Sequence, residues 1–294
     1  MKKNVARRPR FKRVILSEPI RLTNRDKAIL SAVCKFRLLT TGQILSIVPG
    51  SRQNIVRRLQ RLYHAGFLDR PRAQLALRYN GEVSEFVYAP TRKGTAIVQD
   101  GTGSGKESRP VSALAISHTL AVAEALITIK QASRRGGVRF MDEQTILTAL
   151  RTEPSSKRLQ WHITIKSSKE TEAVGVIPDG FFAVERAEDA NAPRRFYYFL
   201  EVDRGTMPIM RKSLALSSIH RKALAYSRTF KTGLLKKRFG IAGFKVLFVV
   251  RSKARLERMK EICQQAHGKE SSRFLFTYPD QMREGNSLHE LGMV

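Results

Sequence analysis

Residues 176–184 read Val-Ile-Pro-Asp-Gly-Phe-Phe-Ala-Val, and residues 196–206 read Phe-Tyr-Tyr-Phe-Leu-Glu-Val-Asp-Arg-Gly-Thr. Both runs are apolar and aromatic and are bounded by turn residues, which predicts two neighbouring β-strands. Each run carries carboxylates at one end: Asp179 in the first, and Glu201 and Asp203 in the second. Because side chains two positions apart on a strand point to the same face, we expect Glu201 and Asp203 on one side of the sheet.

The three carboxylates predict a metal site. Asp179, Glu201 and Asp203 would repel one another without a cation, and hard divalent ions prefer oxygen ligands. We therefore expect these residues to be ligands of Mg²⁺ or Mn²⁺ at a site that could cleave phosphodiesters. Without a metal, replacing Glu201 by Gln should be neutral or stabilising. In the alternative, the carboxylates have structural roles: Asp179 closes a Pro-Asp-Gly turn, and Asp203 acts as a cap or forms a salt bridge near Arg204.

Composition indicates the partner. The chain has 294 residues, with 54 Lys and Arg against 25 Asp and Glu, a formal net charge of +29. Such an imbalance favours a polyanionic partner, with double-stranded DNA first. Residues 111–129 are apolar, but His118 and Glu124 interrupt them, so we expect a buried helix and no membrane partner.

Two further features bear on the compartment. No apolar run follows the basic N-terminus, so we expect no secretory signal and a cytoplasmic protein associated with the nucleoid or a plasmid. Cys34 and Cys263 are far apart in the sequence, which supports neither a disulfide framework nor a zinc site.

Residues 1–19 are predicted to form a basic, flexible arm. Seven Lys or Arg and no acid lie within residues 1–13, which cannot bury an apolar surface. The arm is either a solvated tail or a segment that follows phosphates or enters a minor groove.

Three helices are expected next, over residues 23–36, 40–48 and 51–65, each opened by a Ser or Thr cap. In the third helix, five apolar side chains are expected to face inward: Ile55, Val56, Leu59, Leu62 and Tyr63. Six side chains are expected to face outward: Arg52, Gln53, Asn54, Arg57, Arg58 and Arg61. Arg pairs with guanine, and Asn or Gln pairs with adenine, so this face suits a major groove.

Arg70, Arg72 and Arg78 flank two strand-like runs, residues 73–79 and 84–89, that are typical of a hairpin wing. With the three helices, the pattern resembles the winged-helix DNA-binding family over residues 20–99. The resemblance implies that these three arginines, with the six outward residues of the third helix, bind DNA. The alternative is protein contact, since winged helices also serve as dimerisation modules.

Residues 100–110, rich in Gly and Ser, are predicted to be a linker to a second domain over residues 111–280, followed by a tail of residues 281–294. In that domain we expect helices over residues 113–134, 208–231 and 255–267. Further strands are expected over residues 138–141, 159–166, 244–250 and 273–278. This order predicts an α/β sandwich with a mixed sheet, in a chain of the α/β (α+β) class.

Pro178-Asp179 on one strand and Glu201-x-Asp203 on the next resemble the PD-(D/E)XK nuclease superfamily. The resemblance implies a metal held by Asp179 and Glu201, joined by an acid from a helix, Glu124 or Glu143. The superfamily has Lys two positions after the Glu, where this chain has Asp203. Lys212 is a candidate migrated replacement, with phosphate contact or solvent exposure as its alternatives.

The whole arrangement resembles the replication-relaxation family of bacterial plasmids and mobile elements. The resemblance rests on the winged helix, the linker, His118 in the first helix of the second domain, the Pro-Asp strand, the Glu-Val-Asp-Arg-Gly-Thr run at 201–206, and the later Lys222 and Tyr226. It implies a DNA-binding role in replication, relaxation or mobilisation, with other replication or relaxosome proteins as partners and a homodimer left open. The alternatives are an active metal-dependent endonuclease that nicks DNA, or a transcriptional regulator.

Overall fold

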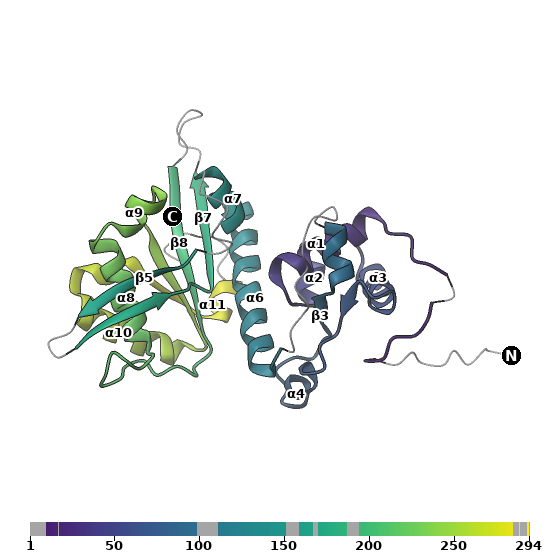
Figure 1. Cartoon of the computed structure of the whole chain (residues 1–294), viewed down its shortest axis with the longest axis horizontal. Coiled ribbons are helices and arrows are strands. Elements are labelled where there is room, and N and C mark those ends of the chain that lie inside the picture. The colour runs from purple at the N-terminus through teal and green to yellow at the C-terminus, as the bar shows by residue number, and fades with distance from the viewer. Residues whose placement is uncertain are drawn as a thin grey trace. The chain divides into compact units, whose positions relative to one another are not determined.

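The computed structural model describes residues 10–16, 18–98, 111–150, 159–166, 170–186, 194–284, 288 and 293 (Figure 1). The protein is mixed α/β, as predicted. It divides into two compact units, residues 1–127 and 128–294, and the division falls within the long helix α6 (Ala113–Arg135). The predicted linker, the first nine residues and most of the predicted tail lie outside the described residues.

The first unit contains the three predicted helices, α1 (Asn24–Phe36), α2 (Thr41–Ile47) and α3 (Arg52–His64). They are capped by the side chains of Thr23, Thr40 and Ser51, and the first two caps are full capping boxes. Three short strands, β1 (Leu39–Thr40), β2 (Leu68–Asp69) and β3 (Val87–Pro90), form an antiparallel sheet in the order β1-β3-β2. Helix α5 (Arg92–Val98) follows.

The predicted wing is wrong in its first strand. Residues 73–79 form helix α4 (Gln74–Tyr79), and the second run forms a strand only from Val87. The buried side chain of Gln74 explains the difference, because its amide bonds to both the N–H and the carbonyl of Val87. That amide takes up backbone groups which a hairpin partner strand would otherwise satisfy.

The first part of α6 completes the core of the first unit. Ile116, Leu120, Ala123 and Ile127 are buried, in the same two hydrophobic clusters as residues of α1, α2, α3 and β3. By length and composition alone, α6 could cross a membrane. In this unit Ile116, Leu120, Ala123 and Ile127 are packed, whereas Leu114 is 60% exposed, and Gln43 of α2 donates to the carbonyl of Leu120 at 3.0 Å.

The second unit is built on a five-stranded mixed sheet in the order β10-β9-β8-β7-β4. These strands are β4 (Arg139–Asp142), β7 (Gly180–Arg186), β8 (Arg194–Asp203), β9 (Lys245–Val250) and β10 (Phe274–Thr277). Strands β8, β9 and β10 are parallel, and the pairs β4–β7 and β7–β8 are antiparallel. The strand expectations are thus confirmed except at residues 176–184, where Val176 ends an unpredicted strand, β6 (Thr171–Val176), and β7 begins only at Gly180, so that Asp179 precedes the strand. Strand β6 pairs with β5 (Trp161–Lys166).

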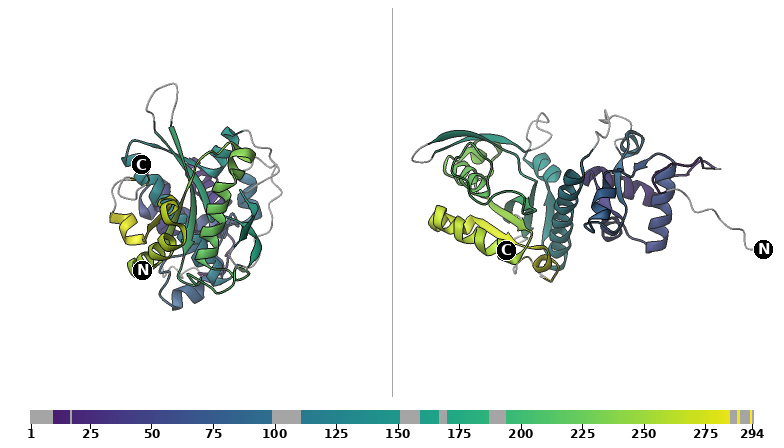
Figure 2. Two further views of the ribbon diagram at one scale, coloured as in Figure 1. Left: turned by 90° about the vertical axis from the view of Figure 1, so that its left-hand side faces the viewer. Right: turned by 90° about the horizontal axis from the view of Figure 1, so that it is seen from below.

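Helices cover this sheet. They are α7 (Glu143–Ala149), α8 (Ile219–Lys231), α9 (Leu234–Phe239), α10 (Lys253–His267) and α11 (Pro279–Glu284), with a 3-10 turn, η1 (Gly268–Arg273). The helix predicted from Pro208 begins only at Ile219, where Ser218 caps it. The ribbon β5–β6 packs over α8, as Figure 2 shows on its right.

An aromatic cluster fixes α8 against strand β8. The rings of Phe199 and Tyr226 lie 5.6 Å apart, and Trp161 of β5 lies within 6.0 Å of both. All three side chains are almost fully buried, and the Trp161 indole donates to Thr229 at 2.8 Å. The polar residues close to this cluster, Glu201 on β8 and Lys222 on α8, are therefore held at fixed positions.

Candidate functional site

Helix α3 presents a basic face. Arg52, Gln53, Asn54 and Arg57 are exposed, and Arg61 is half-buried. No acidic residue lies in α3 or its cap. Most of this predicted DNA-facing set therefore lies at the surface of one helix, where Arg and amide side chains can reach base edges or phosphates.

Arg52 has an acidic neighbour. Its guanidinium pairs with Glu85 at 3.0 Å, while its own side chain stays 69% exposed. Glu85 also accepts from the backbone N–H of Gly42 at the start of α2. The pair therefore links α2 and α3 to the segment before β3. An exposed ion pair of this kind is weak, so a phosphate could replace Glu85 as the partner of Arg52.

Arg58, one of the predicted DNA contacts, is held in an ion pair within the first unit. Its guanidinium makes a bidentate ion pair with Asp26, which is fully buried, and also donates to the carbonyl of Arg21. Burial alone would raise the pKa of Asp26, but hydrogen bonds from Arg58 and Thr23 outweigh it and hold that pKa below its ordinary value. Arg58 thus joins α3 to the start of α1 and cannot reach DNA without breaking this pair.

Arg70 is also structural. It is 7% exposed, and its guanidinium lies 4.2 Å from the ring centre of Tyr63 and 4.4 Å from that of Phe86. One of its nitrogens donates to the carbonyl of Arg10 at 2.8 Å. Burial between aromatic rings gives Arg70 a packing role in this structure and argues against a direct contact with DNA.

The described part of the N-terminal arm contacts the first unit. Arg13 donates to the carbonyls of Tyr63 and Leu68, both at 3.1 Å, and pairs with Asp69 at 2.9 Å. The N–H of Val14 donates to His64 at 3.2 Å. Residues 10–14 therefore run along the C-terminal end of α3, which the expectation of a wholly flexible arm did not include.

Arg72 and Arg78, the other two predicted DNA contacts, flank or lie on α4. Arg72 is exposed, and Arg78 is half-buried with its guanidinium 5.1 Å from the ring centre of Phe86. Both remain available at the surface, although a helix carries them in place of the expected strand.

The predicted acidic cluster lies where β7 meets β8. Glu201 is 2% exposed and accepts from the Tyr226 hydroxyl at 2.6 Å, while its second oxygen accepts from the Lys222 ammonium. Asp179 accepts from the N–H of Val202 at 2.8 Å. Burial raises the pKa of Glu201, with Lys222 opposing this and Asp179 adding to it. Asp179 is therefore close enough to act on the Glu201 carboxyl.

Asp203 has a separate partner. Its carboxylate receives two hydrogen bonds from Arg255 in the first turn of α10, one of them at 3.1 Å, and one from the N–H of Gly205 at 3.2 Å. Arg255 also donates to the carbonyl of Met207. The pair closes the loop after β8, which is the role foreseen in the structural alternative, with Arg255 rather than Arg204 as partner.

The cation of this cluster is Lys222, not Lys212. Lys212 is exposed in the loop before α8, whereas Lys222 and Tyr226 lie four residues apart on the face of α8 that meets Glu201. Burial opposes the charge on Lys222, but Glu201 and Asp179 outweigh it and raise its pKa. Burial, followed by the effect of Glu201, raises the pKa of Tyr226, whose hydroxyl donates to the Glu201 carboxylate.

The donor set does not fit a metal in this arrangement. Both oxygens of Glu201 are engaged, and Asp203 is paired with Arg255. No group of three His, Cys, Asp or Glu suited to a metal occurs among the described residues. The other predicted acids have their own roles, since Glu124 accepts from Gln43 at 2.9 Å and Glu143 accepts from the N–H of Leu159 at 2.9 Å.

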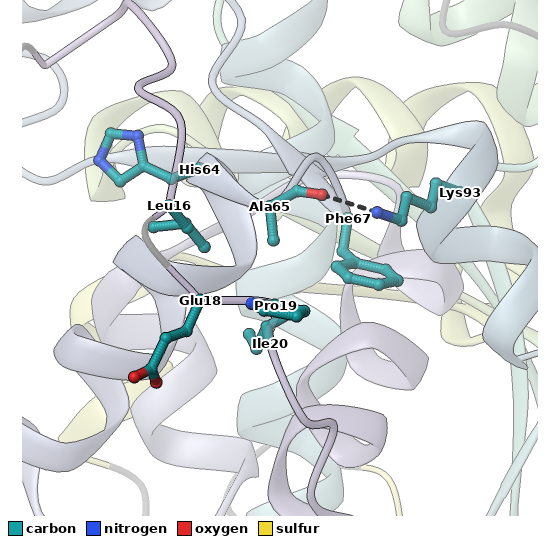
Figure 3. Close-up of a pocket in the computed structure, with 8 residues that line it drawn as sticks. All are labelled: Leu16, Glu18, Pro19, Ile20, His64, Ala65, Phe67 and Lys93. Carbon is teal, nitrogen blue, oxygen red and sulfur yellow. Dashed lines mark hydrogen bonds between the residues drawn. The ribbon is translucent and has the colours of Figure 1, made fainter.

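A shallow hollow of about 420 Å³ lies in the first unit, between residues 16 and 18–20 and the end of α3 (Figure 3). Lys93 on its rim donates to the carbonyl of Ala65 at 3.0 Å. None of the predicted site residues lines it. It is therefore no part of the candidate sites on α3 or at Glu201.

Comparison with known proteins identifies the family of the chain. A family model described as replication-relaxation matches residues 30–243, which include α3, the β7–β8 pair and α8. No curated protein and no solved structure matches the chain. The family's description indicates a role in plasmid or mobile-element replication or relaxation. Because the match covers most of the sequence, the chain belongs to the replication-relaxation family.

Proposed function

We propose that the protein binds duplex DNA of a plasmid or mobile element through α3. The observation that carries the proposal is the exposed face of α3, a helix without acidic residues, which presents Arg52, Gln53, Asn54 and Arg57. Two arginines and two amides can read guanine and adenine in a major groove, and an α-helix fits that groove.

The order of elements in the first unit supports this. A short turn separates α2 from α3, and β2 and β3 follow with the sheet order β1-β3-β2. This arrangement favours the winged-helix interpretation, with α4 lying between β2 and β3 in place of part of the wing. Arg72 and Arg78 would then contact phosphates beside the groove, positioning α3 without reading bases.

The test separates base reading from charge. Gln53→Ala and Arg57→Ala should each weaken binding to a preferred duplex by about 1 to 3 kcal/mol and relax sequence preference. Lys27→Ala is the matched control, because Lys27 is exposed on α1 and its loss removes the same charge as the loss of Arg57. Binding would be measured by fluorescence anisotropy at one salt concentration. Equal effects of Arg57→Ala and Lys27→Ala on all duplexes would refute base reading by α3.

A second candidate is a metal-dependent endonuclease that nicks DNA, or a relic of one. The observation that favours it is the ammonium of Lys222 beside Glu201, with Asp179 nearby. Lys222 supplies from α8 the lysine that the strand lacks at Asp203. Asp179 and Glu201 could accept Mg²⁺ or Mn²⁺ only if Lys222 first released the Glu201 carboxylate. We therefore favour DNA binding without robust cleavage.

Supercoiled plasmid distinguishes the two candidates. We expect no nicking with Mg²⁺ or Mn²⁺, and a melting temperature that Mn²⁺ does not raise. Metal-dependent nicking that disappears in Glu201→Gln, but not in Glu257→Gln, would establish the endonuclease. Glu257 is an exposed acid on α10, so it controls for the lost charge.

The proposal has consequences for partners and place. A protein that binds plasmid DNA would be found with the nucleoid or the plasmid in the cytoplasm, alongside other replication or relaxosome proteins. A homodimer would bind two half-sites, whereas a monomer would bind one. A transcriptional regulator is the variant of this proposal in which the bound site is a promoter.

A further inference from the structure

Val56 on α3 is exposed where its neighbours in the apolar pattern are not. Its exposed fraction is 41%, whereas Ile55, Leu59 and Leu62 are fully buried. The buried residues are spaced four and three apart and form one stripe of the helix. Val56 lies one position further, about 100° around the helix axis, so it lies outside that stripe and its predicted inward position is wrong.

The surroundings of Val56 are polar. Arg52 and Gln53 lie one turn before it on the same side of α3, and Arg57 follows it; all three are exposed. A β-branched residue is a weaker helix former than Ala, Lys or Gln, so helix stability does not favour Val at this position. Core packing does not fully account for it either, because much of the side chain faces solvent.

We propose that Val56 determines sequence specificity by contacting the C5-methyl group of a thymine beside the base pair that Gln53 reads. The inference rests on the proposed function of α3. The thymine methyl is the apolar group that distinguishes a base pair in the major groove, and an apolar side chain recognises it. The two methyl groups of Val56 are stiff about χ1, so little rotamer entropy is lost when the contact forms.

The experiment removes only the methyl group. The full-length protein first selects its preferred duplex from a randomised pool, and each thymine of that duplex is then replaced in turn by deoxyuridine. We expect one replacement to weaken binding about 4-fold, as for one buried carbon. Val56→Ala should weaken binding to the thymine duplex similarly and lose its sensitivity to deoxyuridine at that position.

Two further variants complete the design. Val56→Thr keeps the branched shape and one methyl group, so it should retain part of the preference for thymine. Leu216→Ala removes an exposed apolar side chain in the second unit. It should leave unchanged the ratio of the affinities for the thymine duplex and the deoxyuridine duplex.

The outcomes are separable. Indifference of the wild type to every deoxyuridine, or sensitivity that persists in Val56→Ala, would overturn this inference and leave DNA binding by α3 standing. Binding without any sequence preference would overturn it as well. Failure to bind any duplex would instead defeat the proposed function, and this inference with it.

Discussion

At the scale of single residues, two buried ion pairs show how a basic chain uses its few acids. Asp26 is fully buried against Arg58, and Glu201 is almost fully buried against Lys222. Each acid joins a helix to another element by a charge-assisted bond, which is short and directional. Breaking such a pair costs more than the pair contributes, because it leaves an unpartnered charge.

Asp26→Asn should lower the free energy of unfolding by about 3 kcal/mol at neutral pH, since it leaves the half-buried Arg58 without its partner. The folded-state pKa of Asp26 lies below its ordinary value of 3.8, so its contribution is present above that pH and is lost as the pH falls through the folded pKa. Urea unfolding from pH 7 to pH 3 should therefore show that the difference in free energy of unfolding between wild type and variant becomes smaller below about pH 4. A gap that is constant across this range would show that the ion pair is not the cause.

Glu201→Gln should destabilise the protein by about 2 kcal/mol, because the Lys222 ammonium loses its carboxylate. This reverses the expectation from sequence for a cluster without a metal, which did not include Lys222 as the partner of Glu201. Adding Lys222→Met should recover part of the loss, so the double variant should be more stable than the sum of the single variants predicts. Urea unfolding measures all four proteins, with Glu257→Gln as the control that stays near wild type. A neutral or stabilising Glu201→Gln would mean that Asp179 and Glu201 repel each other without compensation.

The residue roles could be predicted from sequence only where they are local. Thr23, Thr40 and Ser51 cap helices that begin directly after them, so sequence spacing predicted them correctly. Arg58 and Asp26 lie 32 positions apart, and Arg255 and Asp203 lie 52 apart. Nothing in the spacing of these residues indicates that they meet, so Arg58 was assigned to DNA and Arg255 was missed.

At the scale of elements, the three helices α1, α2 and α3 were predictable and the segments that follow them were not. Capping signals and an apolar stripe define α1, α2 and α3. In contrast, residues 73–79 combine helix formers with an alternation that also suits a strand, and the buried Gln74 amide decides between the two. The predicted start of α8 at Pro208 is also too early, because Ser218 caps the helix and Pro208 lies in the loop before it.

The basic arm gives a prediction at this scale. Deleting residues 1–13 should weaken binding to all duplexes similarly, because phosphate contacts carry no sequence information. It should also lower the melting temperature, since the arm loses the contacts of Arg10 with Arg70 and of Arg13 with Tyr63. Deleting residues 1–9 alone retains both contacts and serves as the comparison. Equal melting temperatures for the two deletions would show that the docked residues add nothing to stability.

At the scale of the whole molecule, charge predicts strong salt dependence. A chain with a net charge of +29 should displace condensed counterions when it binds duplex DNA. Affinity should fall about 100-fold between about 50 and 200 mM salt if roughly four phosphates are neutralised. The slope is measured by anisotropy titrations on one duplex. Affinity that hardly changes with salt would show that the charge serves something other than the DNA backbone.

Helix α6 has a consequence for any attempt to move the first unit into another protein. Its first half, through Ile127, supplies side chains to the interior of the first unit, although it follows the predicted linker in sequence. A fragment that ends at residue 99 would lack Leu120, so its neighbours in the core, Leu38 and Val87 among them, would be exposed to water. Such a fragment would tend to aggregate. A fusion protein that preserves function should therefore be joined within α6, after Ile127. The glycine-rich stretch at residues 100–110, which sequence alone would suggest as the junction, should not be used.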